Sequence, residues 1–186
     1  ENIDPTRIGV TGNSGGGNMT AYAVALDDRS TMSAPSCWIA SWYHNGVNEE
    51  PIDAEQCALN ALALGVEQSD LLVVQAPEPT LMITQEQDFF DQRGSLEARE
   101  RLEHIYRLLG AEDSYGYHVG PNVHGYWHDG REAMYAFFNE HANVDAPGRE
   151  PELQIEDDDT LQCTETGQVD DMGAKSVFDF THERSL

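Results

Sequence analysis

One short segment near the start of the chain limits its fold more than any other. Residues 12–16 read Gly-Asn-Ser-Gly-Gly and fit the pattern G-x-S-x-G. An apolar run, Arg7 to Thr11, precedes the segment, and good helix formers follow it from Asn18 to Asp27. A serine on a strained turn between a strand and a helix is typical of a hydrolase nucleophile. We expect Gly12 and Gly16 to be required, because only glycine tolerates the crowding two residues on either side of such a serine.

Ser14 is therefore the predicted nucleophile. The helix that follows would direct its free N–H groups at the reacting carbonyl, where they stabilise a developing oxyanion. The backbone N–H of Gly15 is the predicted oxyanion donor. A phosphate-binding loop is the alternative for a Gly-rich turn, but it would need a Lys followed by Ser or Thr, which this segment lacks.

The rest of the first 143 residues alternates between predicted strands and helices. Further strands are predicted over Met32 to Trp42, Thr80 to Thr84 and Tyr115 to Val119, and further helices over Ala54 to Leu64, Leu96 to Leu109 and Arg131 to His141. Gly110 is a suitable C-cap for the second of these helices. This alternation predicts an α/β fold with a mostly parallel sheet and helices on both faces.

The character of the sequence changes near residue 143. Pro147, Gly148 and Pro151 lead into the acidic run Glu156 to Asp159, and the remainder is polar with short apolar pieces. We therefore expect a catalytic domain over residues 1–143, and an acidic linker with the start of a further segment over residues 144–186.

A nucleophilic serine needs a base, and His124 is the best placed of the seven histidines. It lies in the loop Pro121 to Tyr126, after the last predicted strand and before the last helix. Five of the others are assigned to packing, the surface or the pocket wall: His118 in a strand, His104 and His141 on helices, and His44 and His128 near the pocket.

The base in turn needs an acid to orient it, and in this fold the acid follows a later strand. Asp88 is the best placed carboxylate after the strand Thr80 to Thr84, and Asp91 is second. Glu86 lies too close to the end of that strand. An acid from the segment after the second strand, Asp53 or Glu55, is the remaining alternative.

Aromatic and sulfur-containing residues leave more than one interpretation open. Asn13 and four aromatic side chains near the predicted sheet edge are candidates for a substrate pocket that is apolar or stacks on sugars: Trp38, Trp42, Tyr43 and Trp127. Packing in the core or on the surface explains each aromatic equally well. The three cysteines, Cys37, Cys57 and Cys163, lack zinc spacing, and either a Cys37–Cys57 disulfide or buried free thiols fit.

The charge of the chain is strongly negative. Its 34 acidic residues face 10 Lys and Arg, for a formal net charge of -24. Nucleic acid and anionic membranes are excluded as expected partners, because phosphate binding needs basic side chains. No apolar stretch approaches the roughly 20 residues that cross a bilayer. A solvated acidic surface and adaptation to high salt both explain the charge, and only the second predicts that added salt raises stability.

These residues together resemble the α/β-hydrolase superfamily, and within it the bacterial acetyl-xylan-esterase-like and prolyl-oligopeptidase-like serine hydrolases. The resemblance covers roughly residues 3 to 142. It rests on five stretches: residues 8–17 around Ser14, Ala34-Pro35-Ser36-Cys37, Asp53-Ala54-Glu55-Gln56, Asp88-Phe89-Phe90-Asp91 and His124-Gly125-Tyr126. The elbow and the His-Gly pair occur in many hydrolases, whereas the Asp-Phe-Phe-Asp loop is more specific to this branch.

The resemblance implies hydrolysis of a small-molecule ester, such as an acylated carbohydrate, through an acyl-serine intermediate. It implies no metal and no organic cofactor, and it favours a secreted or periplasmic location. The family has about four strands before the nucleophile strand, and they carry the second oxyanion donor. They are missing here, so we expect the chain to be the C-terminal half of the domain and its partner to be the N-terminal half of the same protein.

Two other functions compete with an esterase. A peptidase of the prolyl-oligopeptidase type would use the same three residues on a different bond. A catalytically incompetent module that binds a partner or supports a structure is the second rival. The presence of Ser14, Asp88 and His124 argues against that module, whereas the expected loss of half the domain argues that this chain alone is inactive.

Overall fold

The computed structural model describes residues 3–48 and 53–185. Contacts divide the chain into two units, Glu1–Glu150 and Pro151–Leu186. The first unit reaches seven residues beyond the expected change at residue 143. Its last residue, Glu150, accepts hydrogen bonds from both Arg131 Nε and Nη2, at 2.5 and 2.6 Å. The α6 helix (His128–His141) thereby holds the end of this unit.

A four-stranded parallel sheet forms the centre of the first unit. Its strands are β1 (Gly9–Asn13), β2 (Met32–Ser36), β3 (Thr80–Gln87) and β4 (Tyr115–Val123), in the order β1-β2-β3-β4. All three strand pairings are parallel. The first six residues of β3 and all five of β2 are buried, as expected for a parallel sheet covered on both faces.

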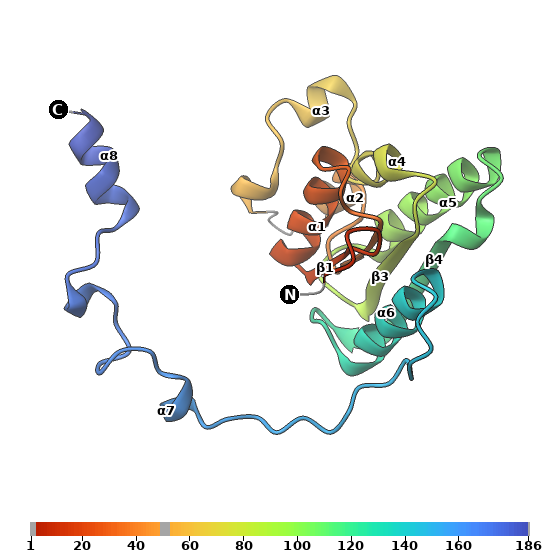
Figure 1. The fold of residues 1–186 in the computed structure, drawn as a ribbon. Helices are drawn as coiled ribbons and strands as arrows, with labels where there is room; N and C mark the ends of the chain where they lie inside the picture. The colour runs from red at the N-terminus through yellow and green to blue at the C-terminus, as the bar shows by residue number, and fades with distance from the viewer. Residues whose placement is uncertain (1–2, 49–52, 186) are drawn as a thin grey trace. The chain divides into compact units, whose positions relative to one another are not determined.

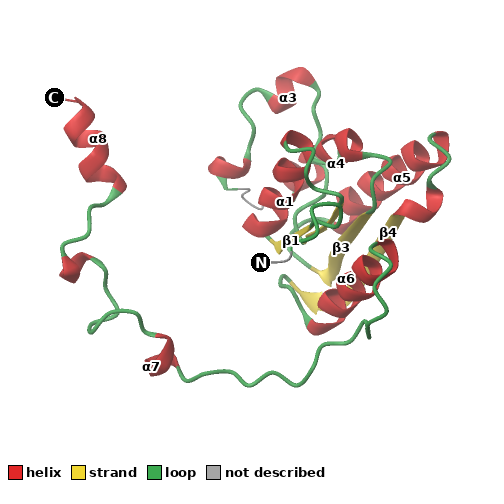
Figure 2. Cartoon of the chain, in the orientation of Figure 1, coloured by secondary structure: helices red, strands yellow, loops and turns green. Residues whose placement is uncertain are grey.

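Helices connect the strands and cover the sheet (Figures 1 and 2). The main ones besides α6 are α1 (Gly15–Leu26), α4 (Asp70–Gln75) and α5 (Gln92–Leu108). Short elements fill the connections: α2 (Trp42–Val47), η1 (Ala54–Gln56), α3 (Ala61–Leu64) and η2 (Glu112–Ser114). None of the described helices is long and apolar enough to cross a membrane.

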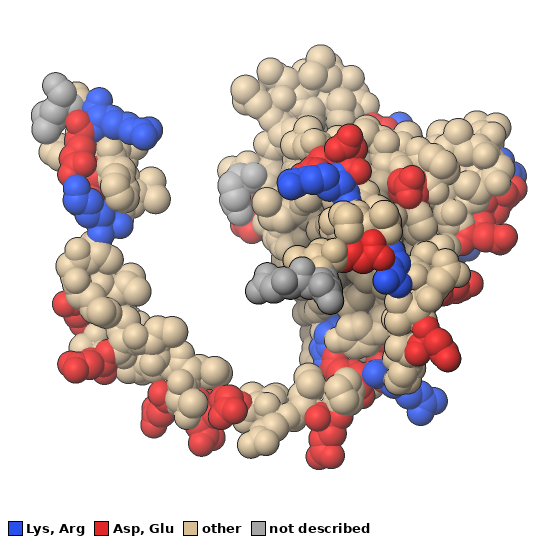
Figure 3. Space-filling model, in the orientation of Figure 1, with Lys and Arg blue, Asp and Glu red and all other residues tan. Residues whose placement is uncertain are grey.

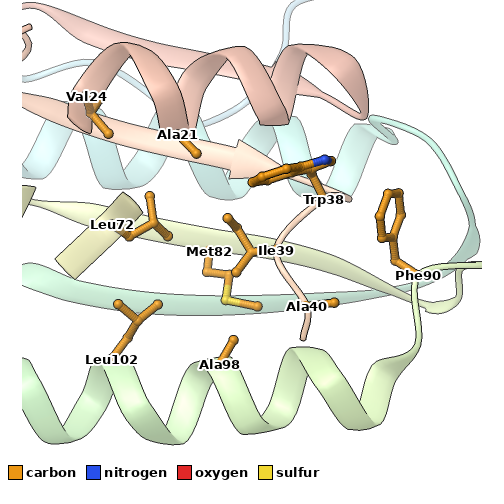
Figure 4. Packing of buried hydrophobic residues seen from close by; sticks show 10 residues of the cluster. All are labelled: Ala21, Val24, Trp38, Ile39, Ala40, Leu72, Met82, Phe90, Ala98 and Leu102. Atoms are coloured by element: carbon orange, nitrogen blue, oxygen red, sulfur yellow. The ribbon is translucent and has the colours of Figure 1, made fainter. Parts of the chain in front are cut away.

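Two hydrophobic clusters lie on opposite faces of the sheet. In the larger one, Ala21 of α1, Met82 of β3 and Leu102 of α5 point toward one another (Figure 4). In the smaller one, Leu81 and Ile83 of β3 pack with Met134 of α6. Neighbouring residues of β3 thus serve the two clusters alternately, as the two-residue period of a strand requires.

Several predicted boundaries are wrong, and backbone conformation explains two of them. The strand expected over Met32 to Trp42 ends at Ser36, because Cys37 has a φ of 51° and leaves the extended region. The helix expected over Ala54 to Leu64 is two short pieces, η1 and α3, and Asn60 interrupts it with a φ of 65°. The α4 helix was not predicted. The C-cap of α5 is Leu109 rather than the predicted Gly110, and Gly110 follows it in the left-handed conformation, with a φ of 66°.

The second unit contains α7 (Asp158–Leu161), η3 (Asp170–Met172) and α8 (Val177–Ser185). Nearly all of its described residues are exposed. Its contacts are local: for example, Ser176 Oγ and Asp179 exchange hydrogen bonds at the start of α8.

Acidic and basic side chains are scattered over the visible surface, and in several places they lie side by side (Figure 3). Seven of the ten Lys and Arg residues form ion pairs with a carboxylate in the described part of the chain. The negative charge therefore remains in excess around these pairs.

Asp91 begins α5, and this role has a measurable consequence. Its carboxylate accepts a hydrogen bond from Arg93 N at 2.9 Å, and the Arg93 guanidinium also donates to it. We expect Asp91→Ala to lower the free energy of unfolding by about 1 kcal/mol, the usual value of an N-cap. Urea unfolding of the full chain measures this, and an unchanged midpoint would contradict it.

The same cap predicts a dependence on pH. The side-chain hydrogen bond from Arg93 holds the pKa of Asp91 below its usual value. A carboxylate whose pKa is lowered by folding stabilises the fold above its unfolded pKa, and this contribution is lost as the pH falls through the folded value. The difference in stability between the wild type and Asp91→Ala should therefore shrink on acidification.

Candidate active site

Ser14 lies at the turn between β1 and α1. Its φ of 57° and ψ of -118° are strained for a residue with a side chain, and strain of this kind gathers at functional sites. The Ser14 N–H donates to the carbonyl of Ser36 on β2 at 2.9 Å, which fixes the turn to the neighbouring strand. As Gly15 is the first residue of α1, its N–H belongs to the helix end where backbone donors lack partners within the helix.

Crowding requires glycine near Ser14, but the sequence pattern identifies only one of the crowded positions. A Cβ at Gly12 would lie 2.6 Å from the Gly16 carbonyl oxygen, so the turn does need glycine there. A Cβ at Gly16 would meet nothing within 4 Å, and the predicted crowding at this position is wrong. The crowding falls on Gly17 instead, where a Cβ would overlap the carbonyl oxygen of Ser36.

Asp88 and His124 come together at the carboxyl ends of β3 and β4. His124 Nδ1 and Asp88 Oδ1 are 2.8 Å apart. The Asp88 side chain is only 1% exposed, whereas that of His124 is 23% exposed. Because all four strands are parallel, Ser14 after β1 lies at the same edge of the sheet as this pair. A neutral imidazole that donates from Nδ1 to a carboxylate keeps its Nε2 as an acceptor.

The alternative acids have other partners. Asp91 caps α5 and binds Arg93, as described above. Asp53 accepts a hydrogen bond from Gln56 Nε2 at 3.1 Å. Glu86 is exposed at the end of β3, and the side chain of Glu55 lies outside the described residues. Among the described candidates, Asp88 is the one in contact with His124.

The last residue of β2, Ser36, and the residue after it, Cys37, contact the turn that carries Ser14 and the loop that carries His124. The sequence alone did not indicate these contacts. Ser36 Oγ donates to Asn13 Oδ1 at 2.9 Å. The next residue, Cys37, is a buried thiol whose Sγ lies 3.5 Å from the carbonyl oxygen of Gly125. Cys37 is thus not part of a disulfide with Cys57. Burial, with a smaller contribution from the nearby Asp88 carboxylate, raises the pKa of Cys37 to about 12, so the thiol stays neutral.

The predicted pocket residues occupy different surroundings. Trp38 is fully buried in the larger cluster, so core packing accounts for it. Tyr43 is 70% exposed on α2. Trp42 Nε1 donates to the Val66 carbonyl, and Trp127 Nε1 to that of Val123. Trp42 also lines a cavity of about 280 Å³ with residues 57–58 and 60–63.

Two further features near the site were missed from the sequence. The His124 ring packs on Phe89 and Phe90, with centroids 4.3 and 5.9 Å away. The backbone carbonyl of Gln56 accepts a hydrogen bond from Asn18 Nδ2. The side-chain Nε2 of Gln56 would lie 3.8 Å from a Cβ placed on Gly15. The amide of Gln56 therefore stands next to the turn that carries Ser14.

Three other histidines in the first unit lie near carboxylates of their own. His118 in β4 contacts Asp129 at the start of α6, with Nε2 and Oδ2 2.9 Å apart. His44 of α2 and His128 of α6 face Glu97 and Glu132, at 3.7 and 3.5 Å. His104 and His141 lie on helices, as predicted.

Comparisons with known proteins place this arrangement in a known fold. No protein-family model and no curated protein matches the sequence. Among solved structures, the chain is similar to methylesterase BT1017, with 30% identity and a TM-score of 0.68 over 81% of this chain and 33% of that one.

It is also similar to a family 15 carbohydrate esterase, a glucuronoyl esterase from Caldicellulosiruptor kristjansonii. Here the identity is 17% and the TM-score 0.65, over 83% of this chain and 49% of that one. A promiscuous esterase of the same family, from a marine bacterial metagenome, shares 21% identity with a TM-score of 0.60, over 75% and 43% of the two chains.

The chain spans between a third and a half of the length of these structures. All three are esterases by their names, and their fold is the one predicted from the turn at Ser14. The parallel sheet, its flanking helices and these neighbours together identify the described residues as part of an α/β-hydrolase fold.

Proposed function

We propose that this chain carries the catalytic residues of a serine-dependent carboxylic ester hydrolase. Ser14 is the nucleophile, His124 the general base and Asp88 the acid that orients His124. The observation that carries the proposal is the 2.8 Å contact between His124 Nδ1 and the buried Asp88 carboxylate, at the sheet edge where Ser14 occupies its strained turn. The esterase names of the structural neighbours support the same chemistry.

The reaction follows from the roles of these groups. His124 Nε2 takes the proton of Ser14 Oγ as this oxygen attacks the ester carbonyl, and Asp88 stabilises the resulting imidazolium. The Gly15 N–H and the positive end of α1 stabilise the oxyanion. The imidazolium then returns its proton to the departing alcohol. Water repeats the two proton transfers on the acyl-serine and releases the acid.

For the substrate, we propose a carboxylic ester of a carbohydrate. Of the three neighbours, two are named as family 15 carbohydrate esterases, one of them a glucuronoyl esterase, and the third as a methylesterase. Methyl esters of uronic acids and acetylated sugars are therefore the substrates to test first. Hydrolysis of p-nitrophenyl acetate but not of a proline-containing peptide anilide would separate the esterase from the peptidase rival.

Labelling with a fluorophosphonate tests the nucleophile. We expect the full chain to be labelled on Ser14, identified by mass spectrometry of the modified peptide, because these reagents react with serines activated by a neighbouring base. Ser14→Ala should not be labelled. Ser30→Ala is the matched control, since Ser30 lies before β2 at the opposite edge of the sheet, and it should be labelled normally. Equal labelling of Ser14→Ala would refute the assignment.

A further inference from the structure

A thiol lies beside the Asp88–His124 pair. Cys37 Sγ, a carboxylate oxygen of Asp88 and a ring nitrogen of His124 all lie within 4.8 Å of one another. These three side chains come from the ends of β2, β3 and β4. The hydrolysis proposed above needs Asp88 and His124, but it gives the thiol no chemical part.

We propose that Cys37, Asp88 and His124 form a binding site for a thiophilic divalent cation such as Zn²⁺, and that the bound ion inhibits the enzyme. The ligands would be the thiolate, a carboxylate oxygen and Nδ1. In tetrahedral zinc sites the bonds of about 2.0 to 2.3 Å place ligand atoms roughly 3.3 to 3.8 Å apart. Small side-chain rotations would bring the three atoms to that spacing.

The second observation that points to a ligand is an unpartnered acceptor on Asp88. Its side chain is 99% buried, and its Oδ2 has no hydrogen-bond partner. A buried carboxylate oxygen without a partner is costly, and an ion can remove the cost. A dication also balances the charges of one carboxylate and one thiolate, and the thiolate is a ligand that Zn²⁺ prefers to Mg²⁺.

Inhibition follows from the two nitrogens of His124. When Zn²⁺ binds, the thiol proton of Cys37 leaves to solvent, and the ion takes the place of the proton on Nδ1. The neutral imidazole then carries its proton on Nε2, which can no longer accept the proton of Ser14. The inhibitory effect rests on the proposed function, whereas the metal site itself does not.

The burial of the ligands predicts slow onset. Cys37 and the Asp88 side chain are each 1% exposed, and Phe89 packs on the His124 ring. The ion must therefore wait for His124 to move before it reaches the other two ligands. Inhibition should deepen over time after mixing and be reversed by a chelator.

Spectroscopy and kinetics on the full chain test the proposal together. Co²⁺ should give a thiolate-to-metal absorption band with one ion per chain. The band should be lost in Cys37→Ser and retained in the double variant Cys57→Ser/Cys163→Ser, which keeps Cys37 as the sole thiol. Zn²⁺ should inhibit p-nitrophenyl acetate hydrolysis at a concentration at least about tenfold lower in the double variant than in Cys37→Ser, and Mg²⁺ should not inhibit.

The outcomes separate the metal site from the enzyme activity. A Co²⁺ band that persists in Cys37→Ser, or no band in a correctly folded wild type, would overturn the site. A Cys37-dependent band in a chain that hydrolyses no ester would leave the site standing and refute the proposed function instead. Serine is chosen because it keeps a donor for the Gly125 carbonyl and so limits loss of folding.

Discussion

Asp88→Asn is expected to lower kcat for p-nitrophenyl acetate by about four orders of magnitude, with little change in KM. An amide at this position can donate to His124 Nδ1 and stabilise the wrong tautomer, with the proton on Nε2, and it cannot balance the imidazolium. The effect falls on kcat because Asp88 is buried behind the imidazole and acts through it. Steady-state kinetics of the purified full chain measure the loss.

Asp91→Asn is the matched control, three residues along the same loop. Asparagine is as good an N-cap as aspartate, so α5 should begin normally and the activity should change less than about tenfold. Its side chain binds Arg93 rather than His124. The reverse pattern, an inactive Asp91→Asn and an active Asp88→Asn, would assign the orienting carboxylate to Asp91.

Local patterns are enough to predict the elements that carry the site. An apolar run, a Gly-rich turn and a row of helix formers specify β1, Ser14 and α1, because each depends on residues close in sequence. Asp88 and His124 were predicted from their places just after a strand. Such places share one edge of a parallel sheet, so the topology brings the two side chains to the contact seen between them.

The part that could not be predicted depends on contacts between distant segments. Cys37 lies 88 positions from Gly125, and no pattern around it indicates that its thiol would stand beside His124. The strand β2 ends early because Cys37 has a left-handed backbone. The sequence does not indicate this end, because the apolar stretch continues to Trp42. The stretch from Trp38 to Tyr43 has aromatic residues at both ends, so its sequence does not distinguish Trp38 in the core from Tyr43 on the surface.

The positions that need glycine also differ in whether the sequence can predict them, because some depend on local contacts and others on contacts with distant segments. The pattern G-x-S-x-G marks Gly12 and Gly16, but the glycine of α1 where an added Cβ would overlap β2 is Gly17. There the helix passes so near β2 that an added Cβ would lie 2.4 Å from the Ser36 carbonyl oxygen. Ser36 also accepts from Ser14 N, so this approach sets the position of Ser14 relative to the sheet.

Gly17→Ala should accordingly destabilise the fold by about 3 kcal/mol or more. The added methyl would overlap the backbone of Ser36 and approach Trp38 Cβ at 3.1 Å, and backbone atoms cannot rotate away as a flexible side chain would. The helix α1 and the strand β2 would have to separate, which also displaces Ser14. Urea unfolding of the full chain, followed by tryptophan fluorescence, measures the loss.

The neighbouring change Gly16→Ala makes the test specific to the contact with β2. It adds the same methyl one residue earlier in the same helix, where nothing lies within 4 Å. Since alanine favours a helix over glycine by up to about 1 kcal/mol, this variant should be as stable as the wild type or slightly more so. Equal destabilisation by the two substitutions would mean that the turn after Ser14 depends on glycine flexibility rather than on the close approach of α1 to β2.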